Sequence, residues 1–252
     1  MALMPYVTGG FPSLAAFTRV VETLAESGAD VIEVGIPFSD PIADGPAIQY
    51  ASEMALRGGA TVRRIVDALA PLDLPCPVVL MSYLNPLLAY GMARFLGDCH
   101  RIGTAGLIVP DLPFDESDEW REACRGAGVR LIQLAAPTSP DARIRRIARQ
   151  SSGFLYCVSL PGTTGVRAEL PKDLTAFLER VKRHTDLPTA VGFGISTPDH
   201  VRALVGRTEG VIVGSRVIEA IRHNEDLPKL IREFKAATRE EINVDCHARR
   251  CE

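Results

Sequence analysis

The stretch VIEVGIPFSDPIADGP, residues 31–46, begins as a buried β-strand and ends as a loop rich in proline, aspartate and glycine. Side chains on a strand alternate between its two faces, so Glu33 shares a face with Val31 and Gly35. Three branched apolar residues occupy the other face, which suits a layer of covering helices. The pattern therefore predicts a strand that points Glu33 into the interior of a barrel, near the end where the strand leaves for its loop.

The same order of strand, polar loop and amphipathic helix recurs along the whole chain. It predicts strands over residues 2–8, 30–36, 77–83, 106–110, 130–137, 154–159, 189–195 and 210–215. It predicts helices over residues 13–28, 61–72, 93–103, 116–128, 141–151, 170–185, 197–207 and 226–238. Eight such units in a chain of about 250 residues favour a single (β/α)8 TIM barrel, here over residues 1–241. An open doubly wound sheet is disfavoured because no GxGxxG turn follows the first strand, and residues 242–252 are expected to form a disordered polar tail.

Composition excludes several classes of function. The chain has 28 basic and 31 acidic residues, a formal charge of −3, and no block of like charges, so nothing indicates a nucleic-acid surface. No apolar run reaches the roughly 20 residues of a membrane span, and no secretory signal is visible, so we expect a cytoplasmic protein. The five histidines fall on helices or the tail and are expected at the surface. Cys246, His247 and Cys251 in the tail are too weak a pattern to predict a metal site.

Glu33 and Asp44 are the candidate catalytic residues. Burying a carboxylate is costly unless it is paired or stays protonated, so a buried Glu33 indicates function, with a pKa raised toward neutrality. The alternative is a structural Glu33 paired with an arginine or a tyrosine. Asp44 alone would be a turn residue, but its loop leaves the strand that carries Glu33. The two acids are expected to flank a substrate, with environments that separate their pKa values.

Glycine-rich segments follow the last three strands and predict an anion site. Residues 159–167, SLPGTTGVR, are typical of a mobile lid. GFGIST follows the seventh strand and VGSRVIEAI follows the eighth, where Ser215 opens a short helical pattern. Backbone N–H groups and a helix N-terminus in this place form the phosphate site of many barrels, although Gly192, Gly194 and Gly214 could instead only ease tight corners. The residues thus predict a phosphorylated small substrate, but not the reaction.

Five segments together resemble the tryptophan synthase α-subunit family, in order and spacing, between about residues 4 and 235: VIEVGIPFSDPIADGPAIQ, GLIVPDLPFDES, GTTGVR, GFGIST and VGSRVI. The resemblance implies a lyase that cleaves indole-3-glycerol phosphate to indole and glyceraldehyde 3-phosphate in tryptophan biosynthesis, with no cofactor in this chain. It implies an acid/base role for Glu33 and an indole-orienting role for Asp44.

The resemblance also assigns further site residues. Tyr156 would lie beside Glu33 and Thr164 would be the lid residue that packs on the Asp44 loop. The phosphate contacts would be Gly165, Gly194, Gly214 and Ser215, and the indole wall would include Phe193 and Tyr83.

A partner is implied as well. The family's α subunit docks on a β subunit that carries pyridoxal phosphate, as an α2β2 tetramer, through mouth loops that here contain Pro41, Asn85 and Pro113. Three alternatives stay open: an autonomous lyase that releases free indole, a non-catalytic barrel that activates a partner, and a phosphosugar isomerase on the same scaffold.

Two departures from the family pattern carry expectations of their own. The family has an extra helix before the first strand, whereas this sequence starts almost on its first predicted strand, so the lower end of the barrel is expected to be bare and to expose apolar surface. Pro161 stands in the lid segment and is expected to stiffen it.

Overall fold

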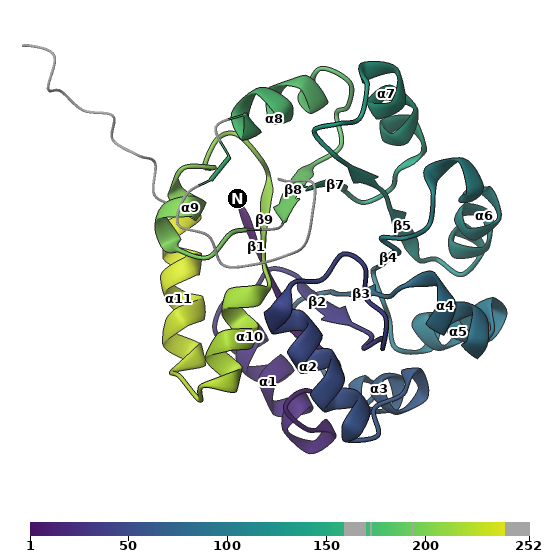
Figure 1. Ribbon diagram of the computed structural model, residues 1–252, viewed down its shortest axis with the longest axis vertical. Helices are drawn as coiled ribbons and strands as arrows, with labels where there is room; N and C mark the ends of the chain where they lie inside the picture. The colour runs from purple at the N-terminus through teal and green to yellow at the C-terminus, as the bar shows by residue number, and fades with distance from the viewer. Residues whose placement is uncertain (159–169, 172, 193, 240–252) are drawn as a thin grey trace, which may run out of the picture.

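The computed structural model of the chain describes residues 1–158, 170–171, 173–192 and 194–239. Its strands form one parallel sheet of nine strands in the order β5-β4-β3-β2-β1-β9-β8-β7-β6. The two end strands of this order are consecutive in sequence, so the sheet curls round to its own beginning, and the helices surround it as in a TIM barrel (Figure 1). The strands are β1 (Ala2–Thr8), β2 (Ile32–Gly35), β3 (Val78–Met81), β4 (Gly106–Ile108), β5 (Arg130–Ile132), β6 (Leu134–Ala135), β7 (Leu155–Val158), β8 (Thr189–Gly192) and β9 (Gly210–Val213).

All eight predicted strands are found, and the fifth is divided. Gln133 separates β5 from β6 and is itself buried. Its side-chain amide donates to the Ser117 hydroxyl at 3.3 Å, while its carbonyl accepts from the Tyr156 N–H at 3.0 Å. Hydrogen bonding between neighbouring strands therefore continues across the break. The single residue Gln133 connects β5 to β6, the two end strands of the sheet, and so closes the barrel.

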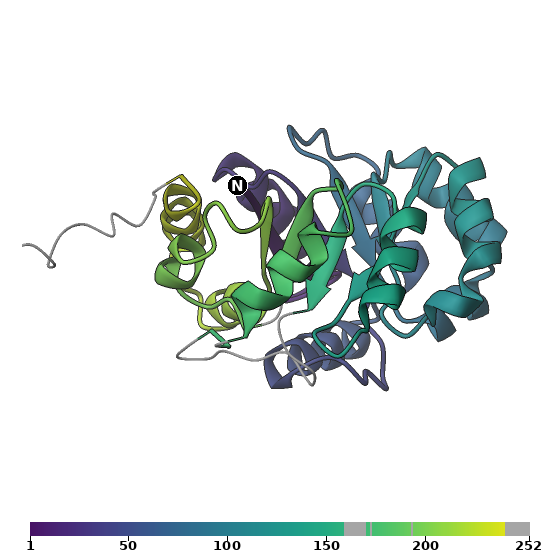
Figure 2. The same ribbon diagram turned by 90° about the horizontal axis from the view of Figure 1, so that it is seen from above.

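The helices form the outer layer, which Figure 2 shows packed around the strands from above. They are α1 (Leu14–Glu26), α2 (Pro46–Arg57), α3 (Val62–Leu69), α4 (Leu84–Tyr90), α5 (Met92–Arg101), α6 (Asp118–Gly126), α7 (Asp141–Gln150), α8 (Leu174–Lys182), α9 (Pro198–Arg202), α10 (Ser215–Arg222) and α11 (Leu227–Ala237), with a 3-10 turn, η1, at Phe114–Glu116.

Helices α2 and α4 were not predicted. Helix α2 buries mostly small side chains, Ala47, Ala51, Ser52 and Ala55, so its apolar periodicity is weak in the sequence. A proline at its first turn and the glycine before it mark its start, because proline tolerates that position. Helix α4 has only seven residues, too few for a periodic pattern.

Several helices begin where capping chemistry predicts. The side chains of Ser13, Thr61, Thr197 and Asp226 each accept a backbone N–H in the first turn of the helix that follows. Such a cap contributes about 1 kcal/mol, which fixes where each helix leaves its loop.

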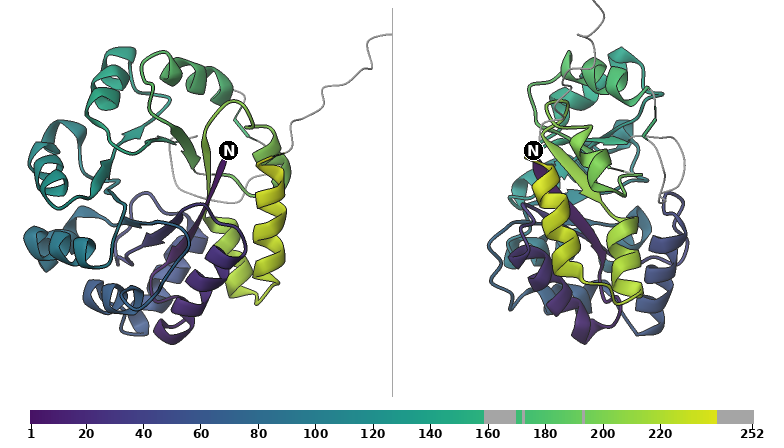
Figure 3. Two further views of the ribbon diagram at one scale, coloured as in Figure 1. Left: turned by 180° about the vertical axis from the view of Figure 1, so that it is seen from behind. Right: turned by 90° about the vertical axis from the view of Figure 1, so that its left-hand side faces the viewer.

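The lower end of the barrel, where the strands start, is tied together by Asp30. Its carboxylate accepts from the Leu3 N–H at 2.7 Å and pairs with Lys235 of α11, so the last helix is held against the first strand. Both views in Figure 3 show α11 along the outside of the barrel beside α1. The exposed apolar surface that was expected at this end is not formed by large, fully exposed side chains among the described residues. In the described part of the chain the exposed large apolar residues are Ile42 and Leu88, which both follow the carboxyl ends of strands.

Two further expectations can be compared with the described residues. Among them, no helix combines the length and apolar character that crossing a membrane requires. The expectation of surface histidines was wrong for His200, which is buried on α9 and whose Nδ1 accepts from the Ser196 N–H at 3.3 Å. The tail predicted to be disordered lies outside the described residues.

Candidate active site

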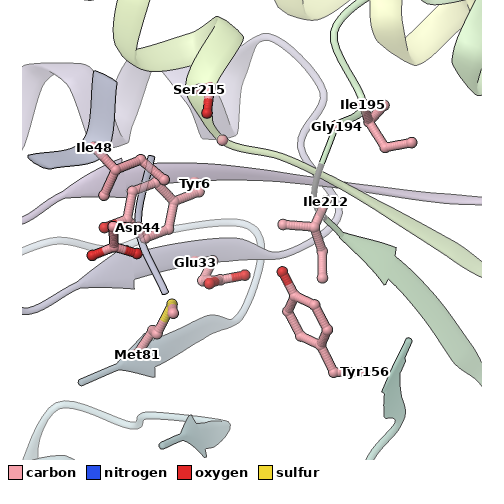
Figure 4. Close-up of a pocket in the computed structure, with 11 residues that line it drawn as sticks. Tyr6, Glu33, Asp44, Ile48, Met81, Tyr156, Gly194, Ile195, Ile212 and Ser215 are labelled. Carbon is pink, nitrogen blue, oxygen red and sulfur yellow. The ribbon is translucent and has the colours of Figure 1, made fainter. Parts of the chain in front are cut away.

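A pocket opens at the carboxyl ends of the strands, on the barrel axis. It brings together both predicted carboxylates and three of the predicted phosphate-binding residues, although they lie far apart in the sequence. Its lining consists of Tyr6, Glu33, Asp44, Ile48, Met81, Tyr156, Gly194, Ile195, Ile212, Gly214 and Ser215 (Figure 4).

Glu33 lies on β2 and points inward, as its strand pattern predicted. Its side chain is 3% exposed, and no lysine or arginine of the described chain forms an ion pair with it. Burial, and secondarily the nearby charge of Asp44, raises the pKa of Glu33 to about 8. At neutral pH this carboxyl group is therefore mostly protonated and available as an acid. The absence of a cationic partner disfavours the structural alternative of an arginine pair.

Asp44 reaches the same pocket from the loop between β2 and α2, and Tyr83 orients it. The Tyr83 hydroxyl accepts the Ala43 N–H at 2.9 Å and donates to the Asp44 carboxylate. Burial raises the pKa of Asp44 to about 6, and the Tyr83 hydrogen bond moderates that rise. Asp44 is therefore ionised at a pH where Glu33 still carries its proton.

Tyr83, which was predicted for the indole wall, is not among the residues that line this pocket. It is buried, and its ring packs against Phe38 with centroids 5.5 Å apart. Its position makes it a support for Asp44.

Two tyrosines enter the pocket, and each lies over a strand glycine. The ring of Tyr6 on β1 extends over Gly35, where an added Cβ would come 2.0 Å from the hydroxyl oxygen. The ring of Tyr156 on β7 extends over Gly192 at the same distance. In Figure 4 the Tyr156 hydroxyl points toward the Glu33 carboxyl group from across the barrel. Because Tyr6 is opposite Glu33 in the β1–β2 register, the two tyrosines enclose the acid from both sides.

The predicted phosphate residues that are described lie on one wall of the pocket. Gly194 follows β8 with a φ of +82°, a conformation that favours glycine. Gly214 precedes α10, and Ser215 is that helix's first residue. The unpaired N–H groups and the positive end of the helix dipole therefore face the pocket that holds the acids. Thr164, Gly165 and Phe193 lie outside the described residues.

The predicted partner residues surround the mouth without lining the pocket. Pro41 is half-buried in the loop that carries Asp44, whereas Asn85 at the start of α4 and Pro113 before η1 are exposed. The exposed Ile42 lies in the same loop as Pro41, and the exposed Leu88 lies on the same helix as Asn85.

The sequence prediction missed five lining residues: Tyr6, Ile48, Met81, Ile195 and Ile212. Tyr6 could have been found, because it alternates inward on β1 as Glu33 does on β2. Ile48 could not, since it lies on the unpredicted helix α2.

The site offers oxygen and apolar groups but no metal-binding cluster. Within residues 1–158, 170–171, 173–192 and 194–239, no three histidine, cysteine or acidic side chains gather closely enough to hold an ion. The arrangement can donate a proton from one carboxyl group, accept a hydrogen bond at another, and hold an anion at α10.

Comparisons with known proteins show which family the chain is similar to. A family profile described as "Tryptophan synthase alpha chain" matches residues 1–246. The tryptophan synthase alpha chain of Roseiflexus castenholzii is 49% identical over 226 residues, which cover 88% of this chain and 87% of that protein. The alpha chain of a Bacillus cereus strain is 46% identical, covering 95% and 93%.

Solved structures give the same result. A Mycobacterium tuberculosis tryptophan synthase structure superimposes with a TM-score of 0.89 at 37% identity, covering 95% of this chain and 93% of the other. The tryptophan synthase alpha subunit of Legionella pneumophila has a TM-score of 0.85 at 35% identity, covering 94% and 92%.

Proposed function

The chain belongs to the tryptophan synthase alpha chain family, and we propose that Glu33 and Asp44 carry out the family's reaction in this protein. That reaction is the cleavage of indole-3-glycerol phosphate to indole and glyceraldehyde 3-phosphate, a lyase step of tryptophan biosynthesis. The observation that carries the proposal is the pair of buried carboxylates with separated pKa values, one about 8 and one about 6, in one pocket that also holds the N-terminus of α10.

Glu33 is the acid and then the base. Its protonated carboxyl group gives a proton to C3 of the indole ring, which makes that carbon a leaving group. The resulting carboxylate accepts the proton of the glycerol hydroxyl next to the breaking bond, as that carbon becomes the aldehyde. One residue thus completes both transfers and ends protonated, as it began. Burial supports this cycle, because it keeps the pKa of Glu33 close to the working pH.

Asp44 is the charge partner of the indole ring. Protonation at C3 places positive charge on the ring nitrogen, and a carboxylate that accepts the indole N–H stabilises that charge where it develops. The Tyr83 hydrogen bond supports this role because it favours the ionised form of Asp44 and fixes the direction of its oxygens.

The far wall binds the phosphate group of the substrate. Gly194, Gly214 and Ser215 present backbone N–H groups and the start of α10, with Gly165 as a further contact from the segment after β7. The family resemblance assigns Thr164 to the lid and Phe193 to the indole wall, and both lie outside the described residues. Tyr156 orients the Glu33 carboxyl group during both proton transfers.

The mouth of the barrel docks a tryptophan synthase β subunit, to which indole passes. Pro41, Asn85 and Pro113 belong to the docking surface, and the exposed Ile42 and Leu88 support it, because large apolar side chains exposed beside a pocket are typical of an interface. Pyridoxal phosphate belongs to the β subunit in this proposal, and the α reaction uses no cofactor. The protein acts in the cytoplasm, and its barrel domain extends to about residue 241.

An indole-release assay on the purified chain, with and without a β subunit, tests the proposal. We expect slow indole release from the chain alone and a large increase with the partner. Full activity alone indicates the autonomous lyase, and a stable complex with no turnover indicates a non-catalytic activating barrel. Rearrangement of the substrate without indole indicates an isomerase.

The Glu33→Gln variant tests the role of the acid. Because an amide keeps the shape but cannot transfer the proton, we expect kcat to fall by roughly 10²–10⁴-fold while substrate affinity is retained. Glu22→Gln, at an exposed position on α1, is the matched control and should leave kcat unchanged. Turnover by Glu33→Gln comparable with wild type would contradict the assignment.

A further inference from the structure

A second concavity lies at the opposite end of the barrel from the active site. It is formed by the C-terminal ends of α6 and α7 and by the start of β5, where the parallel strands begin. Helices α6 and α7 are neighbours on the right-hand side of Figure 1. Four arginines contribute to its lining, which consists of Arg121, Arg125, Gly128, Val129, Arg130, Leu131, Arg149, Gln150 and Ser152.

One of the four arginines is neutralised and three are not. Arg121 pairs with Asp118 at 2.6 Å and donates to the Gln150 side chain at 2.7 Å, which links α6 to α7. Arg125, Arg130 and Arg149 form no ion pair with any residue that the structure describes. The concavity therefore carries an uncompensated positive charge, although the whole chain is slightly acidic.

Helix capping explains only part of this arrangement. Arg125 and Arg149 stand in the last turns of α6 and α7, where a cation interacts favourably with the helix dipole. Arg130 begins the strand β5, so no helix dipole accounts for its position. Its stem lies across Gly153, where an added Cβ would come 2.9 Å from the arginine Cδ, and the exposed residue lines the concavity.

We propose that this arginine pocket, defined by Arg125, Arg130 and Arg149, binds a small anion that carries two or more linked phosphate groups. Unpaired guanidinium groups repel one another until a counter-anion neutralises them, and their planar forks match phosphate oxygens with two hydrogen bonds each. Three separate arginines suit a ligand with several phosphates better than a single phosphate. A concave site on an acidic protein suits a small molecule, not a nucleic acid, which would need an extended basic face.

Calorimetric titration of the full-length chain with inorganic triphosphate tests the proposal. The cell and syringe both contain saturating glycerol 3-phosphate, the non-indole half of the substrate, so that the proposed substrate site is occupied. We expect saturable binding that weakens with added salt, as charge pairing requires. Orthophosphate should bind at least about tenfold more weakly, because it engages fewer arginines. Equal affinity for orthophosphate, or no binding of triphosphate, would overturn the proposal.

Matched double variants locate the site. Arg130→Gln with Arg149→Gln should weaken triphosphate binding by roughly tenfold or more, since each charged hydrogen bond to phosphate is a strong one. Arg19→Gln with Arg232→Gln removes the same charge from exposed positions on α1 and α11 and should leave the affinity within about twofold. Equal weakening by both pairs would show a general charge effect and contradict a site. Indole release should be unchanged in both pairs, which keeps this result separate from the test of the active site.

A third titrant identifies the source of the phosphates. ATP presents the same triphosphate with a nucleoside attached. Binding of ATP more tightly than inorganic triphosphate, and dependent on Arg130 and Arg149, shows that a nucleotide is the preferred ligand. Equal binding assigns the site to the phosphate chain alone.

Discussion

Glu33 and Asp44 share a pocket but differ in what surrounds them, and that difference decides which of them carries a proton. Both are almost fully buried, so desolvation raises both pKa values. Asp44 also accepts a hydrogen bond from Tyr83, whereas Glu33 experiences the negative charge of Asp44. Between about pH 6 and pH 8, Glu33 is therefore a protonated acid while Asp44 is a carboxylate.

The pH dependence of kcat/KM should be bell-shaped as a result. Activity requires Asp44 ionised and Glu33 protonated, so it should rise near pH 6 and fall near pH 8. Because the two acids interact, the limbs report the pair rather than either residue alone. Indole release measured across this range checks the expectation.

The Asp44→Asn variant should have a lower rate and a pH profile without the acidic limb. A variant that kept both limbs would show that Asp44 does not titrate in the reaction.

The Tyr83→Phe variant should displace the acidic limb upward. Removing the hydroxyl takes away the hydrogen bond that favours ionised Asp44, so the pKa of Asp44 should rise. It also leaves the Ala43 N–H without its acceptor, so the loop should hold Asp44 less firmly. We expect kcat to fall by roughly tenfold, and the pH profile separates this electrostatic effect from a loss of fold. Tyr90→Phe, which removes a tyrosine hydrogen bond to Asp98 between α4 and α5, is the control.

At the level of strands, the two glycines beneath the tyrosines decide how close the rings can come to Glu33. Gly35 lies two residues beyond Glu33 on β2, and Gly192 ends β8. Each leaves the space that a tyrosine ring occupies on the neighbouring strand. The strand pattern predicts that Gly35 faces inward but not that a ring from another strand fills its place, because that contact depends on register.

The Gly35→Ala variant should therefore be damaged in activity more than in fold. Its methyl group would lie 2.0 Å from the Tyr6 hydroxyl oxygen and within 2.6 Å of two ring carbons, so the ring must move toward the pocket. We expect a loss of roughly a hundredfold or more in kcat/KM and about 1–3 kcal/mol of stability. Gly97→Ala is the matched control, because a Cβ there meets nothing within 4 Å and should stabilise α5 by up to about 1 kcal/mol. Wild-type activity in Gly35→Ala would argue against a required position of Tyr6.

The elements that the sequence predicted are those with strong periodicity or strong caps. Every strand was predicted, because buried parallel strands read as branched apolar runs. The fifth strand is divided at Gln133, whose side chain contacts Ser117 before α6, and no local pattern reveals that contact. Helix α2 was missed because small buried residues give little periodicity, and with it Ile48 of the pocket wall was missed.

At the level of the whole molecule, the barrel explains why the site could be predicted in outline. Parallel strands all end at the same edge, so an acid on the second strand, an acid in the loop after it, and glycines after the seventh and eighth strands were expected to meet there. Distances and contacts between residues of different strand–helix units, such as the hydrogen bonds of Tyr83 to the Asp44 loop, could be obtained only from the structure. The arginine pocket at the opposite end was invisible for the same reason: its residues come from α6, β5 and α7 and form no run in sequence.

The buried acid should also make the stability of the whole protein depend on pH. The pKa of Glu33 is raised from 4.5 to about 8 on folding, so between these values the native state holds a proton that the unfolded chain has lost. Stability contributed by this group is therefore present below pH 4.5 and is lost as pH rises toward 8, by at most about 1.4 kcal/mol per pH unit. Glu33→Gln removes the titrating group, so its stability relative to wild type should increase steadily from about pH 5 to pH 8. Urea unfolding followed by the single tryptophan, Trp120, which is buried on α6, measures this difference. Glu22→Gln provides the control, and a gap between Glu33→Gln and wild type that stayed constant with pH would show that Glu33 is ionised in the folded protein.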